Sequence, residues 1–349
     1  MSTPIPVVLD TDIGTDVDDA LALTFALASP EIDLIGVTTV DADVLTRARM
    51  AARLLGMAGQ TDVPVIAGAS AALAVGRMPN WFGHEGEGLL DVDWDGDEAP
   101  ILAGSAAQWL VDQSYRAPFH LVAIGAFTNV AQALLIDPTL PERVRNLTVM
   151  GGMVHPEHYD PQWRQFFSET GLPPNHMDHN TACDVEAALM VARAGFQMTW
   201  VTAELTFCTT LHRDAIAEFR DSGTALGDRL ARMLEIWSSR WFHHIPNFPQ
   251  TARPFPSEAV AALHDPLAMA SVFGGDWLTL RDHALSFAQE GDLFAIRQVE
   301  QSDTTPTIHR VSVAVDRDRF NEFFRQRVTA YLHSLRDPST GSDIRRRRP

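Results

Sequence analysis

The chain contains no lysine: all 27 of its basic residues are arginines, in a sequence of 349 residues. This absence excludes several mechanisms. Without lysine there is no P-loop lysine to hold a nucleotide phosphate, no Schiff base with pyridoxal phosphate or a carbonyl substrate, and no lysine general base. Enzyme classes that depend on a lysine at the reaction centre are therefore excluded.

Cysteine is also scarce. Cys183 and Cys208 have neither the number nor the spacing of a disulfide framework or a zinc site, which fits a reducing compartment. The N-terminus lacks a charged and apolar signal segment, and no window approaches the roughly 18 consecutive apolar residues of a membrane span. We therefore expect a soluble protein of the cytoplasm.

Negative charge dominates the composition, with a net charge of -18 and a pI near 5.0. A nucleic-acid backbone or an anionic membrane would be repelled at long range, so neither is expected as a partner. The closing segment, residues 338–349, ends in RRRRP and is the exception. We interpret it as a basic, solvated and disordered tail.

Short β-rich runs alternate with helical patterns, for example IPVVLD followed by DDALALTFALAS. This alternation predicts an α/β fold: one domain over residues 1–337, with a mostly parallel, Rossmann-like sheet and helices on both faces. In such sheets, ligands bind beyond the carboxyl ends of the strands. The residue pattern also predicts helix over 211–241 and 259–273. The long aperiodic stretches 69–100 and 153–179 are expected to be functional loops.

The end of the first predicted strand carries the sequence DTDIGTDVDDA, which crowds aspartates into one turn: Asp10, Asp12, Asp16, Asp18 and Asp19. Carboxylates this close raise each other's pKa, so a bound cation, a shared proton or open water must offset their charge. Gly14 permits an unusual turn, and acids at a helix start suit the helix dipole. An all-oxygen cluster without cysteine favours calcium over zinc.

This turn resembles the signature of the nucleoside hydrolases, the calcium-dependent N-ribohydrolases, whose shorter form reads D-x-D-x-G-x-D-D-A. The resemblance continues in order over most of the chain, through GVTTV, DVPVIAG, GHEGEGL, GAFTNVAQAL, VMGG, DHNTACDVEAA, HDPLA and VAVDRDRF. It implies a homo-oligomeric enzyme, a dimer or tetramer, that hydrolyses the N-glycosidic bond of a ribonucleoside. It also implies one Ca²⁺, held by Asp12, Asp19, Asp265 and the backbone carbonyl of Thr128.

The resemblance further implies that Asp12 is the general base that takes a proton from the attacking water. Nearby carboxylates then stabilise a transition state that resembles a ribosyl oxocarbenium ion. The expected contacts of the ribose hydroxyls are Asp18, Asn180, Asp265 and Asp178, the last where the family usually has Glu. Because two extra residues lengthen the signature, the ribose contact falls to either Asp16 or Asp18.

On the base side, Asp43 stands where most relatives have Asn and matches the purine-preferring branch, whose Asp contacts the base. We expect Asp43 to hydrogen-bond or protonate a ring nitrogen of the base. His84 and His264 match the branch that also accepts pyrimidines, and His264 is the candidate for protonating the leaving group. Trp81 is a candidate for stacking on the base. The remaining candidate substrate contacts are Met150 and, at the 5′-hydroxyl, Asn175.

Two other classes of protein share part of this pattern. A haloacid-dehalogenase-like phosphatase also begins with D-x-D after a strand, but it needs a later lysine to stabilise the phosphate, and this chain has none. A drifted homologue that binds a nucleoside or calcium without catalysis would also keep Asp12, Asp19 and Asp265. An assay of ribose release separates such a homologue from an enzyme.

Overall fold

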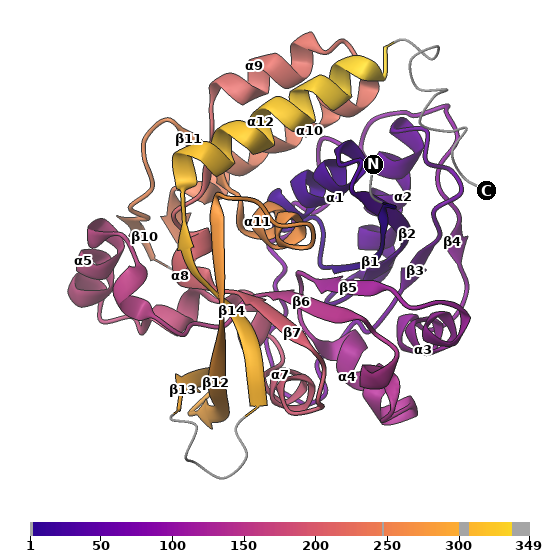
Figure 1. The fold of residues 1–349 in the computed structure, drawn as a ribbon. Helices are drawn as coiled ribbons and strands as arrows, with labels where there is room; N and C mark the ends of the chain where they lie inside the picture. The colour runs from indigo at the N-terminus through magenta and orange to yellow at the C-terminus, as the bar shows by residue number, and fades with distance from the viewer. Residues whose placement is uncertain (1–2, 246–247, 300–306, 337–349) are drawn as a thin grey trace.

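The computed structural model describes residues 3–245, 248–299 and 307–336, and Figure 1 shows their arrangement. A sheet of ten strands runs in the order β13-β12-β14-β7-β6-β5-β1-β2-β3-β4. The strands with parallel neighbours are β1 (Ile5–Thr11), β2 (Ile32–Thr39), β3 (Val65–Ala67), β4 (Ile101–Leu102), β5 (His120–Ala123), β6 (Asn146–Met150), β7 (Met198–Val201) and β14 (Thr307–Val315). Two antiparallel strands, β12 (Leu278–Glu290) and β13 (Leu293–Gln298), extend the sheet beyond β14. The prediction of one α/β domain with a mostly parallel sheet is confirmed.

Strand β1 shows why helices cover both faces of this sheet. Its side chains alternate, so that Val7 and Leu9 enter one hydrophobic cluster while Val8 enters another, and all three are fully buried. The first cluster includes residues of α1 (Asp18–Ala28), α2 (Val44–Met57), α11 (His264–Ser271) and α12 (Arg317–Ser334). The second includes residues of α3 (Ala106–Arg116), α4 (Thr128–Ile136) and α7 (Val185–Ala192). Figure 1 shows the two groups of helices on opposite sides of the sheet.

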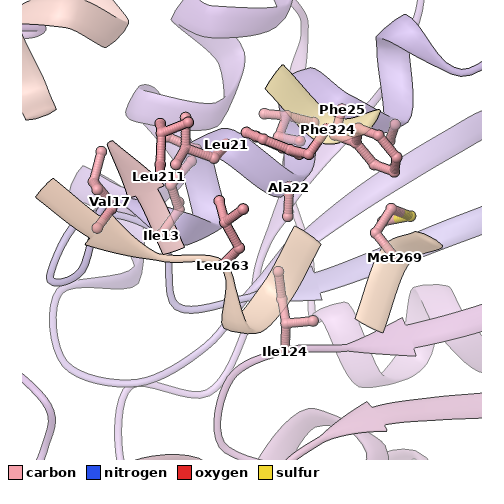
Figure 2. Close-up of a cluster of buried hydrophobic side chains, with 14 of the residues drawn as sticks. Ile13, Val17, Leu21, Ala22, Phe25, Ile124, Leu211, Leu263, Met269 and Phe324 are labelled. Carbon is pink, nitrogen blue, oxygen red and sulfur yellow. The ribbon is translucent and has the colours of Figure 1, made fainter. Parts of the chain in front are cut away.

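Helix α1 is deeply buried along most of its length, and it carries part of the acidic turn at its start. After its two aspartates the sequence ALALTFALA is apolar on every side, as expected of a helix enclosed by protein. Figure 2 shows Leu21, Ala22 and Phe25 of α1 among buried side chains of other segments, including Met269 and Phe324. The ring centroids of Phe25 and Phe324 lie 5.4 Å apart. This packing fixes the position of the aspartates that open α1.

The region after residue 200 differs in part from the prediction. The predicted helix over 211–241 is divided into β8 (Thr210–His212), α9 (Asp214–Asp221), α10 (Ala225–Trp237) and a π-helical turn (Ser238–Phe242). The prediction of helix over 259–273 is wrong at its start, because Ala259–Ala262 form β11, a fully enclosed strand that pairs antiparallel with β8. A separate antiparallel pair consists of β9 (His244–Ile245) and β10 (Phe248–Ala252).

The two long segments expected to be loops differ: the first is irregular throughout, whereas most of the second is helical. Residues 69–100 contain no helix or strand, and all of them are described. Residues 153–179 contain three short helical segments, which are η2 (Pro156–His158), α5 (Pro161–Thr170) and η3 (Pro174–Met177). Short helices α6 (His179–Ala182) and α8 (Ala203–Thr206), and the turn η1 (Leu140–Glu142), complete the fold.

Two further expectations concern the whole chain. Within the described ranges, no helix has the length and apolar character needed to cross a membrane. The basic tail predicted for residues 338–349 lies outside the described residues.

Candidate active site

The acidic turn lies at the carboxyl end of β1, in the middle of the sheet. Strand β1 has β2 on one side and β5 on the other, so the strand order reverses at β1. Ligands in parallel sheets bind in the crevice that forms at the carboxyl ends of the strands at such a point. Asp12, Asp18 and Asp19 are at most 5 % exposed there. Gly14 makes the turn possible: its φ is 124°, and a Cβ at this position would meet Met50 Sδ at 2.7 Å.

A pocket opens at this edge and draws its lining from segments far apart in the sequence. Its lining residues are Asp12, Asp16, Asp18, Asp19, Asn80, Ile124, Met150, Met177, Asp178, His179, Asn180, Phe207, Arg253, His264 and Asp265. The structure therefore brings together most of the residues that the sequence singled out, including the strand-end acids and the HDPLA motif.

Three carboxylates form the tightest acidic group in this pocket. One oxygen each of Asp18, Asp19 and Asp265 lies within 4.8 Å of the others, and all three residues are buried. The backbone N–H of Asp265 donates to Asp18 Oδ2 at 3.4 Å. Burial first, and then the charges of neighbouring aspartates, raise the pKa of each carboxyl well above its usual value. A divalent cation fits this all-oxygen donor set, because it offsets the repulsion that burial makes unfavourable.

Asp12 lies beside this group and faces the same pocket. Asn80 Nδ2 donates to Asp12 Oδ2 at 3.3 Å. Burial raises the pKa of Asp12, while the positive charge of Arg47 opposes the rise. Burial also raises the pKa of Asp16, to about 7, and there Arg253 is the main opposing charge. A carboxylate with a raised pKa at the edge of a pocket is suited to accepting a proton, which is the chemistry expected of Asp12.

The guanidinium of Arg47 is fully buried behind the acidic turn. Its Nε donates to the carbonyl oxygen of Asp41 at 2.9 Å, and its Nη2 donates to the carbonyl oxygen of Asn80 at 2.7 Å. Its Nη1 donates to the carbonyl oxygen of Asp12. Nη2 also lies 3.7 Å from Oδ2 of Asp41. Arg47 therefore connects the turns after β1 and β2 with the long loop 69–100.

Two polar side chains from the segment DHNTA have their positions fixed by their neighbours. The backbone N–H of Gly152 donates to Asp178 Oδ2 at 2.7 Å, and the hydroxyl of Thr181 donates to the same oxygen. Asn180 Nδ2 donates to the carbonyl oxygens of Ile124 at 2.8 Å and Met150 at 3.1 Å. Burial raises the pKa of Asp178. These contacts give the pocket a rigid polar edge.

His264 opens α11 immediately before Asp265 and also lines the pocket. Its Nδ1 lies 2.7 Å from Thr206 Oγ1, and its ring packs edge-on against Phe207 with centroids 4.6 Å apart. Burial, followed by the charge of Arg253, lowers the pKa of His264 to about 3. The imidazole is therefore neutral at physiological pH.

The structure does not place Asp43 in the lining of the pocket. Asp43 is exposed and caps α2, accepting hydrogen bonds from Thr46 N at 3.0 Å and Thr46 Oγ1 at 2.7 Å. These bonds lower its pKa. The cause lies in the backbone, since Asp41 and Ala42 have φ values of 69° and 54°. Asp41, two residues earlier, is the buried acid of this turn, and it accepts a hydrogen bond from Asn80 N at 2.7 Å.

Trp81 and His84 also lie outside the lining of this pocket. The ring of Trp81 covers the buried arginine, with Arg47 Cζ 5.3 Å from its centroid, so its π face already has a cationic partner. His84 lines a neighbouring pocket, where its Nε2 is 2.9 Å from the carbonyl oxygen of Thr15. Its ring stacks near Trp241 with centroids 5.6 Å apart. Both residues support the walls around the acidic turn.

Asn175 and Thr128 are the remaining predicted site residues that do not line the pocket. Asn175 Nδ2 donates to the carbonyl oxygen of Phe294 at 3.2 Å, so it ties η3 to β13. Thr128 opens α4, and its hydroxyl donates to Asp184 Oδ2 at 2.7 Å. The GAFTN segment nevertheless packs on the site, because a Cβ on Gly125 would meet Asp12 N at 2.8 Å and Asp12 Oδ1 at 2.9 Å.

Six lining residues were not anticipated from the sequence: Asn80, Ile124, Met177, His179, Phe207 and Arg253. Arg253 is the most consequential of them. It is 9 % exposed, and its Nε has no hydrogen-bond acceptor within the described part of the chain. Arg253 follows a proline-containing stretch without periodicity, so no sequence signal indicated that its guanidinium lines the pocket.

Comparison with known proteins identifies the class of this enzyme. The sequence model of the family described as inosine-uridine preferring nucleoside hydrolase matches residues 7–322. The non-specific ribonucleoside hydrolase RihC of Salmonella typhi is 27% identical over 339 residues, which cover 95% of this chain and 100% of that protein. Probable uridine nucleosidase 2 of Arabidopsis thaliana is 27% identical over 274 residues, covering 76% of this chain and 77% of that protein.

Solved structures give the same answer for the fold. A plant nucleoside hydrolase, the PpNRh1 enzyme, has a TM-score of 0.75 at 25% identity, covering 94% of this chain and 99% of that one. The match defines a hydrolase of N-glycosidic bonds. More narrowly, the chain belongs to the inosine-uridine preferring nucleoside hydrolase family. The resemblance noted from DTDIGTDVDDA and the motifs that follow it is confirmed.

Proposed function

We propose that this enzyme catalyses the calcium-dependent hydrolysis of the N-glycosidic bond of a ribonucleoside, releasing ribose and a free base. The observation that carries the proposal is the buried acidic group: Asp18, Asp19 and Asp265 lie within 4.8 Å of one another, and Asp12 lines the same pocket. The names of the relatives support the substrate class, since one is a non-specific ribonucleoside hydrolase and another a probable uridine nucleosidase.

The metal ligands follow from the same group. Asp19 and Asp265 are the ligands that the family resemblance implies, and Asp18 lies close enough to join them. Asp12 and the carbonyl oxygen of Thr128 complete the proposed set. Calcium is favoured because every donor is an oxygen atom. When bound, the cation supplies Lewis acidity that makes the attacking water easier to deprotonate.

The chain's own residues account for the remaining steps. Asp12 takes a proton from water as the water oxygen bonds to C1′ of the ribose, and the C1′–N bond breaks with its electron pair passing to the base. The aspartates stabilise the positive charge that develops on the ribosyl group. Asp178 and Asn180, held in place by Gly152 N and by carbonyl oxygens, bind ribose hydroxyls. Asp16 is the freer carboxylate for a further ribose contact, since Asp18 belongs to the metal group.

Ribose release tests this function. Wild-type enzyme is assayed on a panel of purine, pyrimidine and modified nucleosides, with and without a chelator, beside Asp12→Asn and the exposed-site control Asp93→Asn. We expect turnover to require calcium, Asp12→Asn to lose about 10²–10⁴-fold in kcat, and Asp93→Asn to match wild type. Full activity of Asp12→Asn would refute the mechanism. Tight nucleoside binding without ribose release would favour the non-catalytic homologue.

We also propose that the enzyme is a homo-oligomer of the cytoplasm that serves nucleoside catabolism, including purine salvage. The family resemblance supports the assembly, and two free cysteines, Cys183 and Cys208, fit a reducing compartment. Sedimentation at micromolar concentration tests the assembly, and a single monomeric species would contradict it.

A further inference from the structure

The pocket is lined by charges of both signs. Its aspartates come from the turn after β1, from the residue before α6 and from the start of α11, whereas Arg253 follows β10. Among the described residues that line the pocket, Arg253 is the one arginine, and the chain has no lysine. A permanent positive charge therefore lines the same space as six acidic residues.

The Nε atom of Arg253 lacks the acceptor that a buried arginine nitrogen normally has among the described residues. Arg47, the other buried arginine near the site, donates to three carbonyl oxygens. Arg253 is 9 % exposed, yet its Nε meets no acceptor among the described residues, and its main electrostatic counterpart is Asp16, which also lines the pocket. Buried donors without acceptors are rare and unfavourable in folded proteins. An acceptor supplied by the substrate would satisfy this donor.

The reaction supplies such an acceptor at the moment it is needed. Breaking a C1′–N bond with its electron pair going to nitrogen makes the ribosyl group positive and the departing base negative. The aspartates suit the first charge, and a guanidinium suits the second. Stabilisation of developing charge by a fixed donor is among the strongest effects available to an enzyme.

We propose that Arg253 is a catalytic residue that stabilises the leaving base; this rests on the function proposed above. Its N–H groups donate to a nitrogen or oxygen of the base as the C1′–N bond breaks. The base leaves as an anion paired with Arg253 and takes a proton from solvent after release, while the hydroxyl group remains on C1′ and Asp12 holds the proton of the attacking water.

Arg253 suits this role better than His264. The Nδ1 atom of His264 is engaged by Thr206 Oγ1 at 2.7 Å, and its ring is packed against Phe207. A guanidinium stays charged at every working pH and presents several donors in a planar fork, which matches the N–C=O edge of a nucleobase. It stabilises the anion without transferring a proton.

The test compares leaving groups. Arg253→Gln keeps a polar side chain but removes the charge, and Arg253→Lys restores a charge without the fork. Each calcium-saturated variant is assayed on inosine and uridine and on p-nitrophenyl riboside, whose leaving group is already stable as an anion. We expect Arg253→Gln to lower kcat/KM about 10²–10³-fold on the nucleosides and less than about tenfold on the p-nitrophenyl substrate. Arg253→Lys should recover part of the loss.

The matched control is Arg193→Gln, because Arg193 donates to the carbonyl oxygen of Phe287 in a region that does not line the pocket. It should leave both substrates unaffected. Circular dichroism and calcium titration of Arg253→Gln confirm that the fold and the metal site persist. If Arg253→Gln has lost them, the substrate comparison is made on Arg253→Lys, and equal losses on the two substrates overturn the proposal.

Other results also decide the question. Equal losses on both substrate types in folded Arg253→Gln, or no loss on either, overturn the proposal. A nucleoside-selective loss in His264→Gln with none in Arg253→Gln assigns the role to histidine and overturns it too. A wild-type preference for nucleoside 5′-monophosphates that vanishes in Arg253→Gln shows a phosphate-binding arginine and overturns it as well. Failure of wild type on every riboside refutes the proposed function itself, which is a distinguishable outcome.

Discussion

Replacing Arg47 by methionine should damage both the stability and the pH dependence of the enzyme. The guanidinium is fully buried and donates to the carbonyl oxygens of Asp12, Asp41 and Asn80. It also pairs with the Asp41 carboxylate at 3.7 Å. Methionine fills much of the same volume but leaves these oxygens without their donor and leaves Asp41 without its countercharge.

The magnitude follows from these contacts. Removing one partner of a buried ion pair costs about 3–5 kcal/mol, and each unsatisfied buried acceptor adds to the loss. We therefore expect the free energy of unfolding of Arg47→Met to fall by about 3–5 kcal/mol or more. The charge of Arg47 also opposes the rise that burial causes in the pKa of Asp12. Without it the pKa of Asp12 increases, so the acidic limb of the kcat profile moves to higher pH.

Urea unfolding and the pH dependence of kcat measure the two effects separately. Arg47→Lys keeps the charge but loses the planar fork, so it should retain the wild-type acidic limb while losing part of the stability. If Arg47→Met does not fold, Arg47→Lys alone decides the structural part. The prediction is wrong if the free energy of unfolding of Arg47→Met lies within about 1 kcal/mol of the wild-type value and its pH profile is unchanged. A change of that size is typical of an ordinary substitution.

Three further outcomes are expected. In chelator, the protein should be more stable near pH 5 than near pH 8. Burial raises the pKa of Asp10 from 3.8 to about 7, so an ionisation penalty of about 4 kcal/mol develops as pH rises from about 4 and is complete above about 7. Urea unfolding at both pH values checks this, Asp10→Asn should reduce the difference because other buried aspartates keep their own contributions, and stability that rises with pH would contradict it. Asp43→Ala should lower the free energy of unfolding by about 1 kcal/mol, because a helix cap is lost, and should leave kcat/KM on nucleosides unchanged. A large loss of kcat/KM would show that Asp43 acts in the active site. Gly125→Ala should lower kcat about 10–100-fold with little change in helix content, because its Cβ would displace Asp12. Wild-type turnover would instead show that the backbone around residue 125 can shift without moving the Asp12 carboxylate.

The features that the sequence predicted best depend on local pattern. The alternation of strands and helices placed the acidic turn at a strand end, and the parallel sheet then gathered the later strand ends at the same edge. Asp18, Asp19 and Asp265 come together because α1 and α11 pack side by side, each carrying acids in its first turn. Motif order was therefore enough to identify these acids.

The features that the sequence did not predict depend on backbone geometry and on long-range packing. Two consecutive residues with positive φ bury Asp41 and leave Asp43 as a helix cap, and neither residue is a glycine that would signal such a turn. Residues Ala259–Ala262 have the composition of a helix, yet burial on both sides makes them a strand beside β8. Arg253 enters the pocket from a segment without any period, so only the folded structure reveals it.

The contact between Asp265 N and Asp18 Oδ2 joins positions 247 residues apart in the sequence. During synthesis the acidic turn emerges long before α11 exists, and water solvates its carboxylates in the meantime. Docking of α11 against α1 then adds the carboxylate of Asp265 to those of the turn, so this buried like charge accumulates only after a distant part of the chain has been made. A chain that stops short of α11 keeps the signature turn but has no complete pocket. Catalytic activity is therefore expected only once α11 has been made and has docked against α1.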